Sequence, residues 1–196
     1  MILRKNKCSV LNPNRFKFKK VGKDVYLHPM SEIKYKNKVE LGNHIAIDLG
    51  FHMSVSGKFG DYIHIGPHVS IIGGQKSFIE LEDLTSVAAG VKLICLGDEH
   101  LGEGIVGAMV PKEFQDRRIG GSLIIKRFAA IGANSVVLPG VVMGEGSVLG
   151  ANSLLNQNAL PWTVYVGSPA RPVRKRESAK IIKYARQMGD KYVSRS

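Results

Sequence analysis

The side chains in this chain best suited to proton transfer belong to its six histidines. A neutral imidazole accepts a proton near pH 7, and an amine or hydroxyl that attacks a carbonyl carbon must lose one. His64 is one candidate, and Asp61 or Asp83 could orient its ring. His68 follows His64 by four residues, and His100 opens a segment rich in acidic residues and glycine. The other histidines are His28, His44 and His52.

The elements that must position these side chains follow a period of six residues. Between residues 125 and 155 an aliphatic residue opens every step of six, and a small or β-branched residue sits four places later. A helix would space its apolar residues three and four apart, and a half-buried strand would alternate. A fixed period of six indicates the hexapeptide repeat of a β-helix. The hexads begin at Ile125, Ile131, Val137, Met143 and Leu149.

Three hexads make one triangular coil of about eighteen residues, in which each hexad supplies a short strand and a turn. We expect the opening aliphatic residue and the small residue four places later to face inward. Glycine at the second position is expected to let the backbone turn with positive φ. Each coil buries its apolar face only against its neighbours. The predicted fold class is therefore an all-β solenoid, a parallel β-helix of hexapeptide repeats.

The hexads also run in frame from Leu41 to Val69 and then slip at residues 73–76, where we expect a small loop at a corner. With that slip, His64 maps near residue 86 in the next coil. His52 precedes His64 by two hexads, so the two histidines are expected on different sides of the three-sided prism. His28 and His44 fall in the earliest coils.

Residues 96–123 break the repeat inside the predicted β-helix domain, residues 25–176. Long loops in compact domains are usually functional or disordered. An ordered excursion is therefore expected to be a functional segment.

Two terminal segments flank the repeats. Residues 1–24 are predicted to be a lead-in whose Phe16 and Phe18 cap the first coil, because the ends of solenoids need covering. Residues 177–196 are predicted to contain a C-terminal α-helix that packs on the prism or on a neighbouring subunit. The apolar face of this helix is predicted to hold Ile181, Ala185, Met188 and Tyr192.

The net charge of +12 favours anionic partners. No nucleic-acid-binding motif accompanies it, so phosphorylated small molecules are expected rather than nucleic acid. No apolar run approaches the length of a membrane-spanning helix, and no apolar stretch follows the basic N-terminus as in a signal peptide. We expect a cytoplasmic protein without stable membrane insertion, in which Cys8 and Cys95 are reduced thiols.

Three motifs carry a resemblance to a known family: Leu138-Pro139-Gly140-Val141, Gly150-Ala151-Asn152-Ser153 and the closing Gly167-Ser168-Pro169-Ala170. Together with the hexads they resemble the left-handed β-helix acyltransferase superfamily, over about residues 30–176. Left-handed coiling is taken from this resemblance, since the usual crossover rule favours the right hand. The order of motifs is similar to that of small bacterial O- or N-acetyltransferases. These modify sugars, often nucleotide-linked, for O-antigen, capsule or exopolysaccharide.

The resemblance implies a homotrimer with active sites between adjacent prisms and acetyl-CoA as the acyl donor. Acceptor selectivity is then expected to lie in the 96–123 excursion and on the face of the neighbouring subunit. The pantetheine arm would lie against small residues, where a thin ligand approaches the backbone closely. The matching positions are Ala130, Gly132, Ala133, Pro139, Gly150 and Ala151. Cations after the last coil suit the phosphates of coenzyme A. These cations are Arg171, Arg174, Lys175 and Arg176.

The resemblance also implies a histidine base and direct transfer without a covalent acyl-enzyme. His64 matches the expected position of the base, and Asp83 or Asp61 would orient it. His100, at the root of the excursion, and then His68 are the alternatives. A backbone N–H is expected to stabilise the oxyanion.

Three alternatives stay open from the sequence. The chain could be a xenobiotic O-acetyltransferase of the chloramphenicol or streptogramin type, or a non-catalytic trimeric β-helix scaffold. It could also be a zinc enzyme, because γ-class carbonic anhydrases share the hexads. The spacing of His64 and His68 does not match the zinc ligands of that family, so no metal is predicted.

Overall fold

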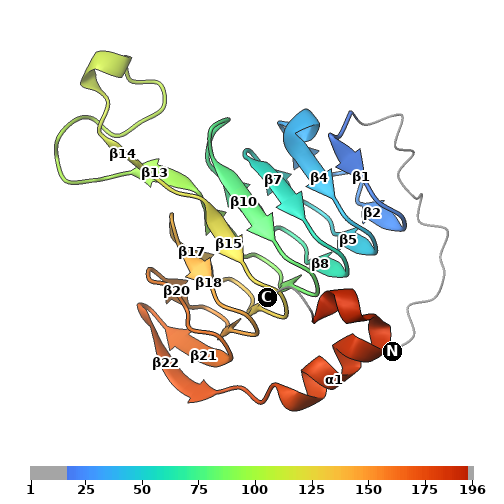
Figure 1. Cartoon of the computed structure of the whole chain (residues 1–196). Helices are drawn as coiled ribbons and strands as arrows, with labels where there is room; N and C mark the ends of the chain where they lie inside the picture. Colours follow the sequence, from blue (N-terminus) through green and yellow to red (C-terminus); the bar gives the residue numbers. More distant parts are fainter. Residues whose placement is uncertain (1–16, 194–196) are drawn as a thin grey trace.

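The computed structural model describes residues 17–193, which form one parallel β-solenoid followed by a C-terminal helix (Figure 1). Three sheets, here called A, B and C, run along the solenoid, and successive strands of the chain enter them in turn. Strands within a sheet pair in parallel with those one coil earlier and later, except where the last strand of sheet B turns back. The predicted parallel β-helix is confirmed.

Sheet A contains β1 (Lys20–Val21), β4 (Val39–Leu41), β7 (Ser56–Phe59), β10 (Phe78–Leu81), β15 (Leu123–Ile125) and β18 (Val142–Met143). Sheet B contains β2 (Val25–Leu27), β5 (Ile45–Ile47), β8 (Ile63–Ile65), β11 (Ser86–Val87), β16 (Ala130–Ile131), β19 (Val148–Leu149), β21 (Thr163–Gly167) and β22 (Ala170–Lys175). Sheet C contains β3 (Glu32–Ile33), β6 (His52–Met53), β9 (Ser70–Ile72), β12 (Lys92–Ile94), β17 (Val136–Val137) and β20 (Leu154–Leu155). Turns between the sheets stack into three edges, called A/B, B/C and C/A.

The prism interior is filled by the residues that the repeat predicts to face inward. The opening aliphatic residues of the hexads in 125–155 are at most 2% exposed. The small residues four places later are buried too. The hydroxyls of Ser135 and Ser153 bond to neighbouring turns, whereas Ser147 Oγ has no partner within residues 17–193. Ser135 Oγ donates to the carbonyl of Gly150 at 2.7 Å, and Ser153 Oγ accepts from the amide of Gly167 at 3.0 Å. A buried hydroxyl left unpaired would cost about 1–3 kcal/mol, so these serines tie successive turns together.

Glycine at the second hexad position has a different role from the predicted one. Positive φ occurs at the fourth position instead, as at Asn134 (58°) and Asn152 (53°). Asparagine tolerates this region better than most residues. At Gly132, a Cβ atom would lie 2.4 Å from the amide nitrogen of Ala151 in the next coil. The positive-φ explanation is therefore wrong, and the second position is glycine because adjacent coils approach closely.

The register between coils agrees with the sequence across the frame slip. Residues 73–76 form the small loop between β9 and β10 at the C/A edge, and Ser86 pairs with His64. His52 lies in sheet C and His64 in sheet B, on different sides of the prism as expected.

The N-terminal end of the prism begins inside the segment predicted as a lead-in. Lys20 and Val21 already pair with β4 in sheet A. Phe18 packs against the core, in agreement with a capping role. Phe16 lies outside the described residues.

The excursion leaves the prism at the C/A edge and forms an antiparallel stalk of β13 (Leu96–Asp98) and β14 (Arg118–Gly120). Its outer part includes a short 3₁₀ turn, η2 (Lys112–Phe114), and projects away from the prism (Figure 1). At the root, the amide of Gly121 donates to the carbonyl of Cys95 at 3.0 Å. This bond closes the coil beneath the excursion, so the prism continues as if the segment were absent. A second 3₁₀ turn, η1 (Lys36–Lys38), lies at the same edge of an earlier coil.

The C-terminal helix α1 (Ala179–Met188) and the 3₁₀ turn η3 (Asp190–Tyr192) run back along the prism (Figure 1). The helix ends at Gly189, whose φ is 144°. Their apolar face packs on residues of the A/B edge, which confirms the predicted docking on the prism. Of the four predicted residues, Met188 is the one left exposed. The contacting residues are Ile181, Ala185 and Tyr192 on one side and Leu84, Phe128 and Trp162 on the other.

A buried carboxylate fastens the end of this helix. Asp61 accepts hydrogen bonds from Lys191 Nζ at 2.7 Å, from Tyr192 Oη at 3.3 Å and from the amide of Asn43 at 2.8 Å. Burial alone raises the pKa of Asp61, but the bonds from Lys191 and Asn43 outweigh it and leave the pKa below its ordinary value. Stability from this carboxylate is therefore present above the ordinary aspartate pKa and is lost as pH falls through the lowered one.

We expect Asp61→Asn to weaken docking of the helix by about 1–3 kcal/mol, the cost of breaking a buried charged hydrogen bond. Trp162, the single tryptophan, packs against the same apolar cluster as Ala185 and Tyr192, so its fluorescence is expected to report release of the helix. Wild-type emission should shift as the pH falls through the lowered pKa of Asp61, and the variant should show the shifted emission already at pH 7. Asp24→Asn, which removes an exposed carboxylate, is the control and should behave as the wild type. Identical acid titrations of wild type and Asp61→Asn would refute this role.

Candidate active site

His64 lies on the outer face of sheet B, where its ring is oriented by a carboxylate from the preceding coil. Its Nε2 is 2.9 Å from Oδ2 of Asp48, which directly follows β5. The two side chains are 58% and 35% exposed. A carboxylate that accepts from Nε2–H leaves Nδ1 as the free acceptor of the neutral ring. His64 can therefore take a proton at Nδ1 from a ligand on the surface of sheet B.

The partner of His64 is neither of the carboxylates proposed from the sequence. Asp83 lies at the A/B edge, where its Oδ1 accepts from the amide of Asp61 at 2.7 Å. Asp61 is bound to Lys191 in the docked C-terminal segment. Both carboxylates are thus held on another edge of the prism, and the prediction that one of them orients His64 is wrong.

Pairing with a carboxylate one coil earlier is not unique to His64. Nδ1 of His44 lies 3.0 Å from Asp24, and Nδ1 of His52 lies 3.1 Å from Glu32. These pairs lie at the A/B edge and on sheet C. The pairing alone is therefore a feature of the fold, and what distinguishes His64 is its surroundings.

Small side chains surround His64 on sheet B and along the B/C edge. Ser86 and Ala130 follow it in the same column of outward-facing residues. Five of the six positions proposed for the pantetheine arm lie in this area. They are Ala130, Gly132, Ala133, Gly150 and Ala151.

Pro139 is the exception among those six positions, because it belongs to the turn between β17 and β18 at the C/A edge. Within one prism it lies across sheet C from the other five. A single protomer therefore does not bring all six together.

The C-terminal cations divide into two groups. Arg171, Arg174 and Lys175 lie in β22 with exposed side chains, beyond the last parallel strand of sheet B. Arg176 instead donates from Nη1 to the carbonyls of Phe128 and Gly146, at 2.8 and 2.9 Å. Burial lowers the pKa of Arg176. Arg176 therefore stabilises the A/B edge, and its predicted place with the phosphate-binding cations is wrong.

His100 lies just beyond the stalk of the excursion. Its amide donates to Oδ2 of the buried Asp116 at 2.9 Å, while its side chain is exposed. His64 on sheet B, Asp83 at the A/B edge and His100 in the excursion thus lie apart, and one chain does not bring them together. His68 lies at the B/C edge, where a Cβ at Gly50 would meet its ring.

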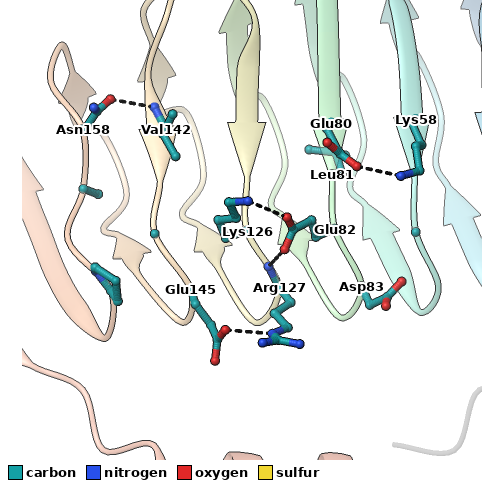
Figure 2. Close-up of a pocket in the computed structure, with 14 residues that line it drawn as sticks. Lys58, Glu80, Leu81, Glu82, Asp83, Lys126, Arg127, Val142, Glu145 and Asn158 are labelled. Carbon is teal, nitrogen blue, oxygen red and sulfur yellow. Dashed lines mark hydrogen bonds and ion pairs between the residues drawn. The ribbon is translucent and has the colours of Figure 1, made fainter. Parts of the chain in front are cut away.

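A groove of about 600 Å³ crosses the outer face of sheet A (Figure 2). Its charged walls are joined in pairs, as by Lys58 with Glu80 at 2.9 Å and Arg127 with Glu145 at 2.8 Å. Glu82 accepts from both Lys126 Nζ and the amide of Arg127. These side chains bind one another across successive strands, which makes the groove a ladder of ion pairs.

Two features of this surface could not be predicted from the sequence. Asp48 precedes His64 by sixteen residues instead of a full coil, so the hexad frame does not align them. A cavity of about 550 Å³ between the 73–76 loop and the stalk of the excursion depends on two segments outside the repeat.

Two features are absent from residues 17–193: a metal-binding cluster and a membrane-spanning helix. No three histidine, cysteine, aspartate or glutamate side chains there are grouped to hold a metal ion. Within the same residues, no helix has the length and apolar character to cross a membrane.

The repeat of six residues and the parallel β-solenoid that it forms place this chain in the class of hexapeptide-repeat proteins. No protein-family profile matches the chain. The chain is 31% identical over 169 residues to the dTDP-4-amino-4,6-dideoxy-D-glucose acyltransferase of Escherichia coli. The aligned region covers 84% of this chain and 85% of the relative. The chain therefore belongs to the left-handed β-helix acyltransferase family, as the resemblance indicated.

Solved structures agree. A variant of AntD, an N-acyltransferase from Bacillus cereus, in complex with dTDP-4-amino-4,6-dideoxyglucose and coenzyme A has a TM-score of 0.85. The two sequences are 28% identical, and the match covers 89% of this chain and 92% of the AntD chain. AntD was also solved with dTDP and 3-hydroxybutyryl-CoA, with a TM-score of 0.83, 28% identity, and 88% and 90% coverage. The coenzyme expected from the sequence is thus the one bound in these relatives.

Chloramphenicol acetyltransferases match over much less of the chain. The chloramphenicol acetyltransferase of Morganella morganii is 34% identical over 58 residues, 30% of this chain and 28% of the relative.

Proposed function

We propose that this acyltransferase moves an acyl group from coenzyme A to the amino group of a dTDP-linked amino sugar. The observation that carries the proposal is the likeness to AntD over most of both chains, in a complex with such a sugar and coenzyme A. The acylated nucleotide sugar would supply a surface glycan such as O-antigen, and the reaction would take place in the cytoplasm, where both substrates are made.

The outer faces of the prism support a trimer. Sheet A carries ion pairs, and the A/B edge is covered by the chain's own C-terminal segment. The C-terminal halves of sheets B and C present aliphatic side chains that are only half-buried in one protomer. These are Ala130, Val148 and Val164 on sheet B and Val136 and Leu154 on sheet C. The B/C edge of one prism would then meet the C/A edge of the next.

The excursion supports the same assembly, because apolar side chains of its outer part are exposed. Met109 is 96% exposed. The others are Leu101, Ile105, Val106, Phe114 and Ile119. Large exposed apolar patches mark interaction sites, and a second copy of this chain would cover this one.

In this assembly, different residues of the chain bind the coenzyme and transfer the proton. The small residues along the B/C edge would hold the pantetheine arm, and Arg171, Arg174 and Lys175 would bind the phosphates of coenzyme A. His64 takes the proton from the sugar amine at Nδ1 as the nitrogen forms its bond to the thioester carbonyl carbon. The carbon–sulfur bond then breaks, and the thiolate leaves. Asp48 holds the ring and stabilises the imidazolium that forms.

Thiol release from acetyl-CoA and from 3-hydroxybutyryl-CoA tests the proposal. With dTDP-4-amino-4,6-dideoxyglucose as acceptor we expect turnover with at least one donor, and with chloramphenicol a rate at least about a thousandfold lower. A site built to bind a polar substrate rejects analogues that leave its polar groups unpaired. Sedimentation of the same sample should show a trimer. Comparable rates with chloramphenicol would support the antibiotic-modifying function, and a trimer that binds no coenzyme A would support the scaffold.

A further inference from the structure

A cavity of about 550 Å³ lies at the C/A edge, between the small corner loop and the root of the excursion. Its volume is in the range of sites for small organic ligands. Glycines and short polar side chains make most of its wall, and a single large apolar side chain, Leu96, takes part. The lining residues are Gly74, Gln75, Lys76, Ser77, Leu96, Gly120, Gly121 and Ser122.

The corner loop that forms one wall is held by hydrogen bonds at both of its ends. The amide of Gly73 donates to Ser54 Oγ at 3.2 Å, and Ser56 Oγ donates to the carbonyl of Ser77 at 2.7 Å. Between them, the amides of Gln75 and Lys76 donate to no group in residues 17–193. The loop is therefore a fixed turn with two uncommitted N–H groups.

The charge in this cavity differs from that of the groove on sheet A. No carboxylate lines it, and the ammonium of Lys76 forms no ion pair within the described part of the chain. In the groove, by contrast, Lys58, Lys126 and Arg127 are each bound to a glutamate. Successive backbone N–H groups beside a lysine favour an anion.

The cavity adjoins the turn that contains Pro139, one of the proposed coenzyme contacts. A Cβ at Gly121 would lie 2.6 Å from Cα of Gly140, so the root of the excursion sits directly against this turn. Leu96 and Gly120 face each other across the stalk. An anion bound here would thus lie beside both the proposed coenzyme groove and the segment expected to select the acceptor.

We propose that this cavity binds the diphosphate of the acceptor nucleotide, through Lys76 and the amides of Gln75 and Lys76. This inference rests on the proposed function, because it takes the acceptor to be a nucleoside diphosphate sugar. It adds the place where the diphosphate binds and the residue that selects for it.

Calorimetry with dTDP on the intact trimer tests the inference. Lys76→Gln should weaken dTDP binding at least about tenfold, the usual effect of losing one charge-assisted contact. Gly74→Val should weaken it similarly by filling the cavity, because a Cβ there meets only Leu96, at 3.7 Å. Lys34→Gln, which changes an exposed lysine at the C/A edge of an earlier coil, is the matched control and should bind as the wild type. Affinity for coenzyme A should stay unchanged in all three.

Competition identifies the group that is recognised. Inorganic pyrophosphate should displace dTDP from the wild type, and thymidine should not. Displacement by thymidine alone, or wild-type dTDP affinity in Lys76→Gln and Gly74→Val, would overturn the inference while leaving the proposed function intact. If the wild-type protein binds no dTDP but turns over another acceptor, both this inference and the proposed function are overturned. Measurements on the wild type are enough to detect that outcome.

Discussion

A His64→Gln variant should turn over at least about a hundredfold more slowly than the wild type, while it still forms a trimer and binds coenzyme A. A general base contributes about a hundredfold to ten-thousandfold, and glutamine cannot take up the proton. Nε2 of His64 is bound to Asp48, so Nδ1 is the nitrogen that takes up the proton. The variant loses turnover because it lacks this acceptor. The acid limb of the pH–rate profile should disappear in the variant. The measurement is kcat with saturating acyl-CoA and acceptor from pH 5 to 9.

The chain supplies a matched control for this prediction. His52 is likewise paired with a carboxylate one coil earlier, Glu32, at 3.1 Å, but through Nδ1 and on sheet C. His52→Gln should therefore keep wild-type turnover. Asp48→Asn should lower turnover about tenfold, because Asp48 positions the ring without touching substrate. Full activity in His64→Gln would move the base to another residue, and His100 would be tested next.

Removal of the excursion should abolish acceptor turnover and leave the prism folded. In this variant an Asn-Gly turn replaces residues 97–119 and joins Leu96 to Gly120, which already face each other across the stalk. The hydrogen bond between Gly121 and Cys95 closes the coil beneath the excursion. The melting temperature of the prism should therefore change little. Positioning of the acceptor would be lost, and kcat/KM should fall more than about a hundredfold.

Binding measurements separate this effect from a loss of assembly. Coenzyme A and dTDP should still bind if the trimer survives, because the proposed sites for both keep their residues. A trimer of the shortened chain with normal kcat/KM would show that the excursion does not select or position the acceptor.

The repeat made much of the fold predictable, because a fixed period of six allows few arrangements. The pairing of Ser86 with His64 followed from counting hexads across the slip at 73–76. The partner of His64 did not follow, because Asp48 reaches it diagonally between coils and no period encodes a diagonal. The antiparallel stalk was missed for a related reason, since β13 and β14 pair across a long non-repeating segment.

The candidate site was only partly predictable, because its residues lie on different edges of one prism. Small residues such as Gly132 and Ala133 serve the close packing of coils and a proposed ligand alike, so their types do not separate the two roles. Arg176 shows the reverse case: its charge suggested a phosphate, but its position beside the carbonyls of Phe128 and Gly146 gives it a structural role.

Strand β22 closes sheet B at the C-terminal end of the solenoid. A stack of parallel strands ends in a row of open backbone groups, which is a template for end-to-end polymerisation and fibril growth. Here β22 turns back antiparallel on β21, and its Pro172 lacks an N–H to offer a further strand. Arg171, Arg174 and Lys175 add repulsion between two such ends. The last strand therefore disfavours the stacking of a second copy on the end of sheet B.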